Sequence, residues 1–247
     1  MNRLGDCGDF VILGANGSIG AELARLLRAD GAELTLLGRD QAAVSALAVQ
    51  LGARWSLLPA VDPGSVRDAL LAACRDRKVA GVANCIGSLW LKPANRTTVA
   101  EWDEVIAVNL GSAFGVAMAA PQLLPDGGSV VFVSSVAARV GLANHEAIAA
   151  AKAGVEGLAR ASAATHARRG IRFHCVAPAL VHTRMTSALL SRPGTAEACA
   201  KQNPLGRIGQ PQDVARAIAF LLDPANSWID AEVLAVDGGF GSVRGSA

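Results

Sequence analysis

Three side chains in the middle of the sequence have the chemical types that can stabilise charge on a substrate oxygen. Ser135 ends an apolar run, and Lys152 follows within a helical pattern over 144–169. A hydroxyl can donate a hydrogen bond to an oxygen, and an ammonium places positive charge beside it. His145 lies seven residues before Lys152, so its imidazole shares that helical face if the helix begins by Asn144. The structural alternatives are a strand-end serine bonded to backbone, a solvated lysine and a solvated histidine at a helix start.

A glycine-rich turn, "LGANGSIGAELA", lies between the first apolar run and the first helical pattern. Its glycines are Gly14, Gly17 and Gly20, and its other members include Asn16, Ser18 and Ile19. Such glycines let the backbone turn tightly and approach a pyrophosphate, to which the following helix offers N–H groups and a positive dipole end. The turn predicts a dinucleotide site, and a plain tight strand–helix turn is the alternative.

The end of the second apolar run indicates which dinucleotide is bound. A carboxylate there suits the ribose hydroxyls of NAD, but the sequence has Gly38 and Arg39. A guanidinium suits a 2′-phosphate through paired hydrogen bonds, so we expect NADP(H) to be favoured over NAD(H). Arg39 could instead cap the turn or stack on the adenine. Asp40 could serve NAD or cap the next helix.

The elements that position these residues are apolar runs alternating with longer helical patterns. The runs predict strands at 9–14, 32–38, 54–60, 79–87, 128–135, 171–178 and 231–239. The patterns predict helices at 18–31, 40–52, 63–77, 99–120, 144–169 and 211–223. Continuous apolar strands in this alternation predict an α/β fold with a doubly wound parallel sheet, a Rossmann fold, as one domain over 1–247. The irregular segment 179–210 is too long for an ordinary loop and is predicted to be a substrate lid.

Composition argues against several other classes of protein. Apolar residues make up 51% and charged residues 18%, which argues against disorder. The net charge is +2 with scattered basic residues, so we expect no nucleic-acid and no membrane partner. We find no targeting pattern and no uninterrupted apolar stretch of membrane-spanning length. The five cysteines form no C-x-x-C pair, so we expect incidental thiols in a reducing cytoplasm and no metal site.

Over nearly its whole length the chain resembles the short-chain dehydrogenase/reductase family. The family's T-G-x-x-x-G-x-G turn corresponds to 13–20, where Leu13 replaces the threonine and Ser18 the middle glycine. The C-terminal "PLGRIGQPQDVA" and "VDGG" are close to the family's wording. Further landmarks are Asn84 and Gly87 of "NCIG", Asn109 of "VNL", and Pro178 and Thr183 at the ends of "PALVHT".

The resemblance implies roles for several of these residues. Asp62 would hydrogen-bond the adenine amino group, although a helix cap before Pro63 is equally compatible. Lys152 would bind the nicotinamide ribose, and Asn109 would help to hold a water beside it. The family also implies a small-molecule substrate and a symmetric homo-oligomer, a tetramer or a dimer, formed partly by the helix over 99–120.

The family's catalytic tyrosine is missing. It lies four residues before the lysine, where this sequence has Ile148, and the chain contains no tyrosine at all. The enoyl-reductase branch places its tyrosine seven residues before the lysine, with a nonpolar residue at the four-before position. His145 and Ile148 resemble that layout. The chain is also similar to dienoyl-CoA reductases, which lack the tyrosine four residues before the lysine.

Three functions remain open from the sequence. The first is a reductase that transfers hydride between NADPH and a small carbonyl or conjugated enone or enoyl substrate, with a non-standard proton donor. The second is a dinucleotide-binding protein with little redox activity, and the third is a lyase or isomerase on the same fold. We favour the reductase because the site keeps Ser135, Lys152 and Asn109.

Overall fold

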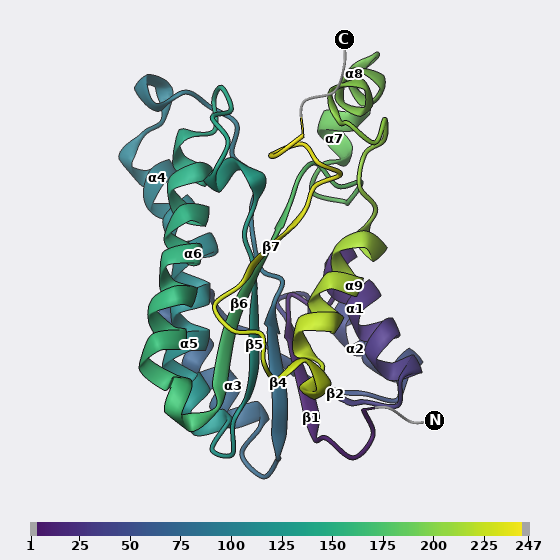
Figure 1. The fold of residues 1–247 in the computed structure, drawn as a ribbon, viewed down its shortest axis with the longest axis vertical. Helices are drawn as coiled ribbons and strands as arrows, with labels where there is room; N and C mark the ends of the chain where they lie inside the picture. The colour runs from purple at the N-terminus through teal and green to yellow at the C-terminus, as the bar shows by residue number, and fades with distance from the viewer. Residues whose placement is uncertain (1–3, 244–247) are drawn as a thin grey trace.

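The computed structural model describes residues 4–243 and places seven parallel strands in one sheet between two layers of helices (Figure 1). Residues 1–3 and 244–247 of the predicted 1–247 domain lie outside the described residues. The strands are β1 Asp9–Leu13, β2 Glu33–Gly38, β3 Arg54–Leu57, β4 Val79–Asn84, β5 Gly128–Val133, β6 Ile171–Pro178 and β7 Val233–Val236. Their order is β3-β2-β1-β4-β5-β6-β7, so the order reverses between β1 and β4 and opens a crevice at the carboxyl ends there.

The predicted doubly wound α/β fold is therefore confirmed, with shorter strands than the sequence patterns suggested. The run over 79–87 ends as a strand at Asn84, and the run over 128–135 ends at Val133. The residues beyond these points leave the sheet at its carboxyl edge, where they form the loops of the candidate site described below.

Helices cover both faces of the sheet. In Figure 1, α1, α2 and α9 lie on one side, and α3, α4, α5 and α6 lie on the other. Their bounds are α1 Ser18–Ala29, α2 Gln41–Leu51, α3 Pro63–Ala73, α4 Val99–Ile106, α5 Ser112–Leu123, α6 Glu146–His166 and α9 Pro211–Leu222. Both faces carry a hydrophobic core because successive strand residues point to opposite sides: Phe10 and Ile12 join one cluster, whereas Val11 and Leu13 join the other.

The helical stretch from α4 through a π-helical turn to α5 corrects one sequence expectation. The stretch Val99–Leu123 is long and apolar enough, by length and composition, to span a membrane, although 44% of its most apolar window is buried inside the protein. Its inner face contributes Val116 and Ala119 to the hydrophobic core beneath the sheet. A core helix of a doubly wound fold is apolar for this reason, so its composition is explained by packing.

The segment predicted to be a lid, 179–210, contains two short helices rather than irregular chain alone. These are α7 Ser187–Leu190 and α8 Thr195–Gln202, which lie above the carboxyl edge of the sheet in Figure 1. The two ends of the segment are joined where His182 N donates to Gly209 O at 2.8 Å and Gly209 N donates to Leu180 O at 3.0 Å. The segment therefore leaves the core of the fold and returns to it at one point, which these two hydrogen bonds fix.

Candidate active site

A cavity of about 730 Å³ opens at the carboxyl edge of the sheet, beneath the 179–210 segment. Most of the residues predicted for the site line it: Gly17, Ser18, Ile19, Gly20, Gly87, Ser135, His145, Lys152, Pro178 and Thr183. Six predicted residues lie outside its lining: Gly14, Asn16, Arg39, Asp62, Asn84 and Asn109. The remaining wall is largely apolar, with Leu89, Leu142, Met185, Leu189 and Phe240 among its members.

The glycine-rich turn is shaped by close backbone contacts. Gly14 has φ +69°, a conformation that side-chain-bearing residues rarely adopt. A Cβ on Gly20 would lie 2.5 Å from the carbonyl oxygen of Gly14, so the helix can approach the turn this closely only with glycine there. Gly17 caps α1 without any side-chain hydrogen bond, which leaves the first N–H groups of the helix for another acceptor. This cradle fits a dinucleotide pyrophosphate.

Arg39 lies at the end of β2 with an exposed side chain, and no partner for its guanidinium occurs within residues 4–243. Two carboxylates that could also contact a cofactor, Asp40 and Asp62, cap helices. Asp40 accepts a hydrogen bond from Ala43 N at 3.0 Å as the cap of α2. Asp62 likewise caps α3 through Ser65 N, and these hydrogen bonds from Ser65 lower the pKa of its carboxyl group. The capping alternatives for both residues are therefore confirmed.

Lys152 is buried, with a 6% exposed side chain, so the alternative of a solvated lysine is wrong. One of its N–H groups donates to the backbone oxygen of Val133 at 2.7 Å. Burial lowers the pKa of its ammonium to about 8. A Cβ on Gly87 would stand in ordinary van der Waals contact with this ammonium, at 3.5 Å, and in tighter contact with Asn109 Oδ1, at 3.2 Å.

Ser135 follows β5 and lines the cavity, with its Oγ accepting a hydrogen bond from Ala137 N at 3.2 Å. Its hydroxyl hydrogen has no acceptor among the described residues, so it remains available to donate into the cavity. The adjacent Ser134 was not predicted and points elsewhere, donating to Glu156 Oε1 on α6 at 3.0 Å. This bond ties the end of β5 to the helix that carries Lys152.

Asn109 lies in the π-helical turn between α4 and α5 and clamps a loop residue that the sequence analysis missed. Its side chain donates to Ser88 Oγ at 2.9 Å and accepts from Ser88 N at 3.1 Å. Asn84 plays a similar role one step earlier, accepting from Ile86 N at 3.1 Å. Ser88 lines the cavity, and its position directly after the "NCIG" motif was the only signal for it in the sequence.

His145 corrects the prediction about the helix start. Helix α6 begins at Glu146, because Asn144 has a left-handed φ of 64° and His145 is only the half-helical cap. The histidine still lines the cavity, half-buried, with its Nδ1 2.8 Å from the oxygen of Ala143. That acceptor assigns a proton to Nδ1 and makes Nε2 the nitrogen that can exchange a proton.

Ile148 lines the same cavity but is 4% exposed. It packs with Val105, Ala147 and Ala151, and Trp90 packs against this cluster from the loop. Position 148 is therefore part of an apolar wall of the cavity.

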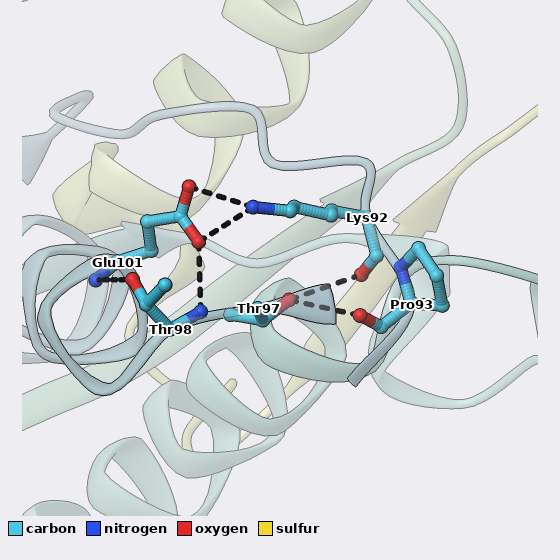
Figure 2. A network of polar contacts seen from close by, with 5 residues as sticks. All are labelled: Lys92, Pro93, Thr97, Thr98 and Glu101. Atoms are coloured by element: carbon cyan, nitrogen blue, oxygen red, sulfur yellow. Dashed lines mark hydrogen bonds and ion pairs between the residues drawn. The ribbon is translucent and has the colours of Figure 1, made fainter. Parts of the chain in front are cut away.

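A polar network fixes the loop that carries Ser88 and Trp90 (Figure 2). Lys92 Nζ donates to both carboxylate oxygens of Glu101 at 2.8 Å, and Glu101 completes a capping box with Thr98 at the start of α4. The backbone N of Lys92 donates to the oxygen of Asn144 at 2.9 Å. The same loop residue therefore holds both the α4 terminus and the residue that precedes His145.

Arg184, in the 179–210 segment, is a second residue that sequence reasoning missed. Its guanidinium donates to the backbone oxygen of Asn16, and its backbone N donates to Ser18 Oγ at 3.1 Å. The neighbouring Thr183 is bonded to Thr186 instead, with 3.1 Å between the two hydroxyl oxygens. The only sequence signal for Arg184 was its place directly after the "PALVHT" segment.

Two cysteines, Cys85 and Cys199, line the cavity. Burial raises the pKa of the Cys85 thiol to about 12, so its reactive thiolate is scarce at neutral pH. All five cysteines are free. Within residues 4–243, no group of three or more His, Cys, Asp or Glu side chains is placed to hold a metal ion.

Comparison with known proteins gives the chain's relationships. Residues 14–241 match the family described as Enoyl-(Acyl carrier protein) reductase. Cis-4-hydroxycyclohexanecarboxylate dehydrogenase of Sinomonas cyclohexanicum is 36% identical over 250 residues, covering 94% of this chain and 96% of that protein. Galactitol 2-dehydrogenase (L-tagatose-forming) of Cereibacter sphaeroides is 34% identical over 236 residues, covering 93% of each chain.

Among solved structures, a short-chain type dehydrogenase/reductase from Mycobacterium ulcerans is similar with a TM-score of 0.91 and 25% identity. The similarity covers 98% of this chain and 92% of that one. The matching motifs, the relatives and the fold agree along nearly the whole sequence. The chain therefore belongs to the short-chain dehydrogenase/reductase family of nicotinamide-dinucleotide oxidoreductases.

Proposed function

We propose that this protein transfers hydride between NADP(H) and a small, largely apolar carbonyl or conjugated enone or enoyl substrate. The observation that carries the proposal is one cavity lined by a buried cation, Lys152, and a hydroxyl, Ser135, whose hydrogen has no acceptor among the described residues. Such a pair stabilises negative charge that develops on a substrate oxygen. The glycine-rich turn forms part of the same cavity, which supports binding of a dinucleotide alongside the substrate.

In this proposal the chain's own residues hold the cofactor. The turn from Gly14 to Gly20 takes the pyrophosphate, and Arg39 takes the 2′-phosphate of NADP(H). The bound cofactor supplies or accepts a hydride. Lys152 holds the nicotinamide ribose and keeps its ammonium beside the substrate oxygen. Asn109 holds the Ser88 loop at the cavity wall through the two hydrogen bonds described above.

His145 is the proposed proton donor in place of the missing tyrosine. Its Nδ1 faces the oxygen of Ala143, so the imidazolium gives up its other proton, from Nε2. Ile148 cannot exchange protons, and its apolar neighbours give no substitute at that position. Ser135 then hydrogen-bonds the substrate oxygen while His145 delivers the proton.

The direct test is an NADPH-oxidation assay of the purified protein with a panel of ketones, conjugated enones and enoyl thioesters. Turnover of one substrate class, with a lower rate in Lys152→Met, supports the proposal. NADPH binding without turnover of any class would instead indicate a nucleotide-binding protein with little redox activity. Turnover of a substrate without any change in NADPH would indicate a lyase or isomerase.

The variant Ile148→Tyr places a phenol four residues before Lys152, the family's arrangement. It should create or raise activity on simple ketones if the ring can displace the packing around Trp90. A folded, NADPH-binding Ile148→Tyr protein that leaves every ketone untouched would count against this placement of the reacting oxygen.

We also propose that the protein forms a symmetric homo-oligomer, a dimer or a tetramer. Large apolar side chains are exposed on the outer surface of α4 and α5, where Val99, Trp102 and Phe114 are 77%, 40% and 49% exposed. An apolar helix surface of this kind suits association with an equivalent surface of a second copy. A monomer at micromolar concentration in light scattering would overturn this.

A further inference from the structure

The 179–210 segment contacts the glycine-rich turn through Arg184, whose partners lie 166 and 168 residues away in the sequence. The guanidinium donates to the oxygen of Asn16, and the backbone N donates to Ser18 Oγ. Arg184, Ser18 and Gly17 line the same cavity. The contact therefore lies at the turn that the proposed function assigns to the pyrophosphate.

The charges around this contact are unbalanced. Helix α1 has no acidic residue in its first turn, so its positive end is not neutralised by its own side chains. The guanidinium of Arg184 meets a neutral carbonyl, and among residues 4–243 no carboxylate pairs with it. Arg207, in the same segment, differs because it forms two hydrogen bonds with Asp213, at 2.6 and 3.1 Å. An exposed cation without a carboxylate partner, beside a positive helix end, can bind an anion.

We propose that Arg184 is a ligand of the cofactor's pyrophosphate and that it couples cofactor binding to the position of the 179–210 segment. This inference rests on the proposed function. A guanidinium forms paired, charge-assisted hydrogen bonds with phosphate oxygens, which are stronger than its bond to a neutral carbonyl. On cofactor binding, the guanidinium exchanges the oxygen of Asn16 for a phosphate oxygen.

The local structure transmits this exchange to the substrate side of the cavity. Arg184 lies in a turn closed by Thr186, whose Oγ1 donates to the oxygen of Val181 at 2.6 Å. Helix α7 starts at the next residue, Ser187. Met185 and Leu189, on either side of that start, line the cavity. A displacement of Arg184 therefore moves apolar side chains at the substrate pocket.

The test compares dissociation constants by isothermal titration for NADPH, NADH and ADP, which all carry a pyrophosphate. Arg184→Gln should weaken all three by a similar factor, about 10- to 100-fold. Arg39→Gln should weaken NADPH alone, because only NADPH has a 2′-phosphate. Arg192→Gln, in the same segment and exposed, is the matched control and should change none of them.

Hydrogen exchange of peptides covering 183–203 supplies a readout independent of activity. ADP should slow exchange there in the unmodified protein but not in Arg184→Gln. Arg184→Lys keeps the charge without the planar fork, so it should fall between the two. If Arg184→Gln fails to fold, Arg184→Lys still tests the inference, because full affinity and full protection in that variant would overturn the role of the guanidinium.

The outcomes separate this inference from the proposed function. If the unmodified protein binds neither NADPH nor NADH, the proposed function fails and the inference fails with it. If the unmodified protein binds and oxidises NADPH, but Arg184→Gln binds all three nucleotides equally well and shows the same protection, only the inference is overturned. A loss confined to NADPH would assign Arg184 to the 2′-phosphate and would also overturn it.

Discussion

The two sides of the candidate site are built from different parts of the chain. The β1–α1 side consists of backbone: glycines, a helix end and a turn whose geometry is imposed by contacts such as that of Gly20 with the Gly14 oxygen. The β5–α6 side consists of side chains, Ser135, His145 and Lys152, that several hydrogen bonds hold in place. A site made of backbone groups tolerates few substitutions, because its geometry depends on them. A site made of side chains can change its chemistry by substitution while the fold of the protein stays the same.

Ile148 illustrates that difference. With isoleucine at this place, α6, the buried lysine and the cavity are all present, and the isoleucine joins an apolar cluster. An added methyl group on the opposite side of the site, at Gly20, would force two backbone segments apart. We therefore expect substitutions on the backbone side to weaken cofactor binding and substitutions on the side-chain side to lower turnover.

The largest effect is expected from the proposed proton donor. His145→Ala should lower turnover about 10²- to 10⁴-fold, the usual loss for a general acid, while NADPH affinity stays unchanged. Steady-state kinetics and titration with NADPH measure the two quantities. His182→Ala, an exposed histidine of the 179–210 segment, is the control and should have no effect. A mild loss of turnover in His145→Ala would indicate that an ordered water, rather than His145, delivers the proton.

The opposite result is expected at the backbone side. Gly20→Ala places a methyl group 2.5 Å from the Gly14 oxygen, so the turn must shift, and NADPH binding should weaken about tenfold or more with a loss of about 1–3 kcal/mol in stability. Calorimetric titration and thermal unfolding measure both. Gly157→Ala is the matched control, since its added methyl group meets no atom within 4 Å and alanine favours the helix. Equal behaviour of the two variants would contradict the steric argument.

The sequence predicted the helices and strands of the backbone side well because their causes are local. Glycine spacing, the caps at Asp40 and Asp62 and the apolar runs depend on neighbours a few residues away. The strand ends were placed three residues too late at β4, where the apolar Cys85 and Ile86 continue past the sheet, and two too late at β5, where two serines follow Val133.

The β5–α6 side could be predicted only in part, because the contacts that place its side chains join residues that are far apart in the sequence. The left-handed Asn144, which keeps His145 out of the helix, is held by the backbone N of Lys92. The clamp between Ser88 and Asn109 and the contact between Arg184 and Asn16 are likewise long-range. No local pattern in the sequence encodes such pairs.

The pH dependence of turnover sharpens the role of Lys152. Burial lowers its pKa to about 8, so the ammonium is present below that pH and is lost above it. The rate of reduction should therefore fall by up to about tenfold per pH unit above 8. Lys152→Arg, whose guanidinium stays charged, should lose this alkaline decline even if its rate is lower throughout. A decline that persists in Lys152→Arg would assign it to another group.

The smallest effect on turnover is expected from a buried base that does not line the cavity. His174 on β6 is fully buried, and burial, reinforced by the charge of Arg172, lowers its pKa to about 4. Between about pH 6.5 and 4 the unfolded chain binds a proton that the folded chain does not, so the free energy of unfolding should fall as the pH drops, by up to about 1.4 kcal/mol per unit. His174→Gln lacks this contribution, so its melting temperature should fall less than that of the unmodified protein between pH 6.5 and 4. The difference in melting temperature between the two proteins should therefore narrow toward pH 4. Melting curves of both proteins across this range measure it, with His182→Gln as the exposed control. Parallel curves for the unmodified protein and His174→Gln would mean that folding does not lower the pKa of His174.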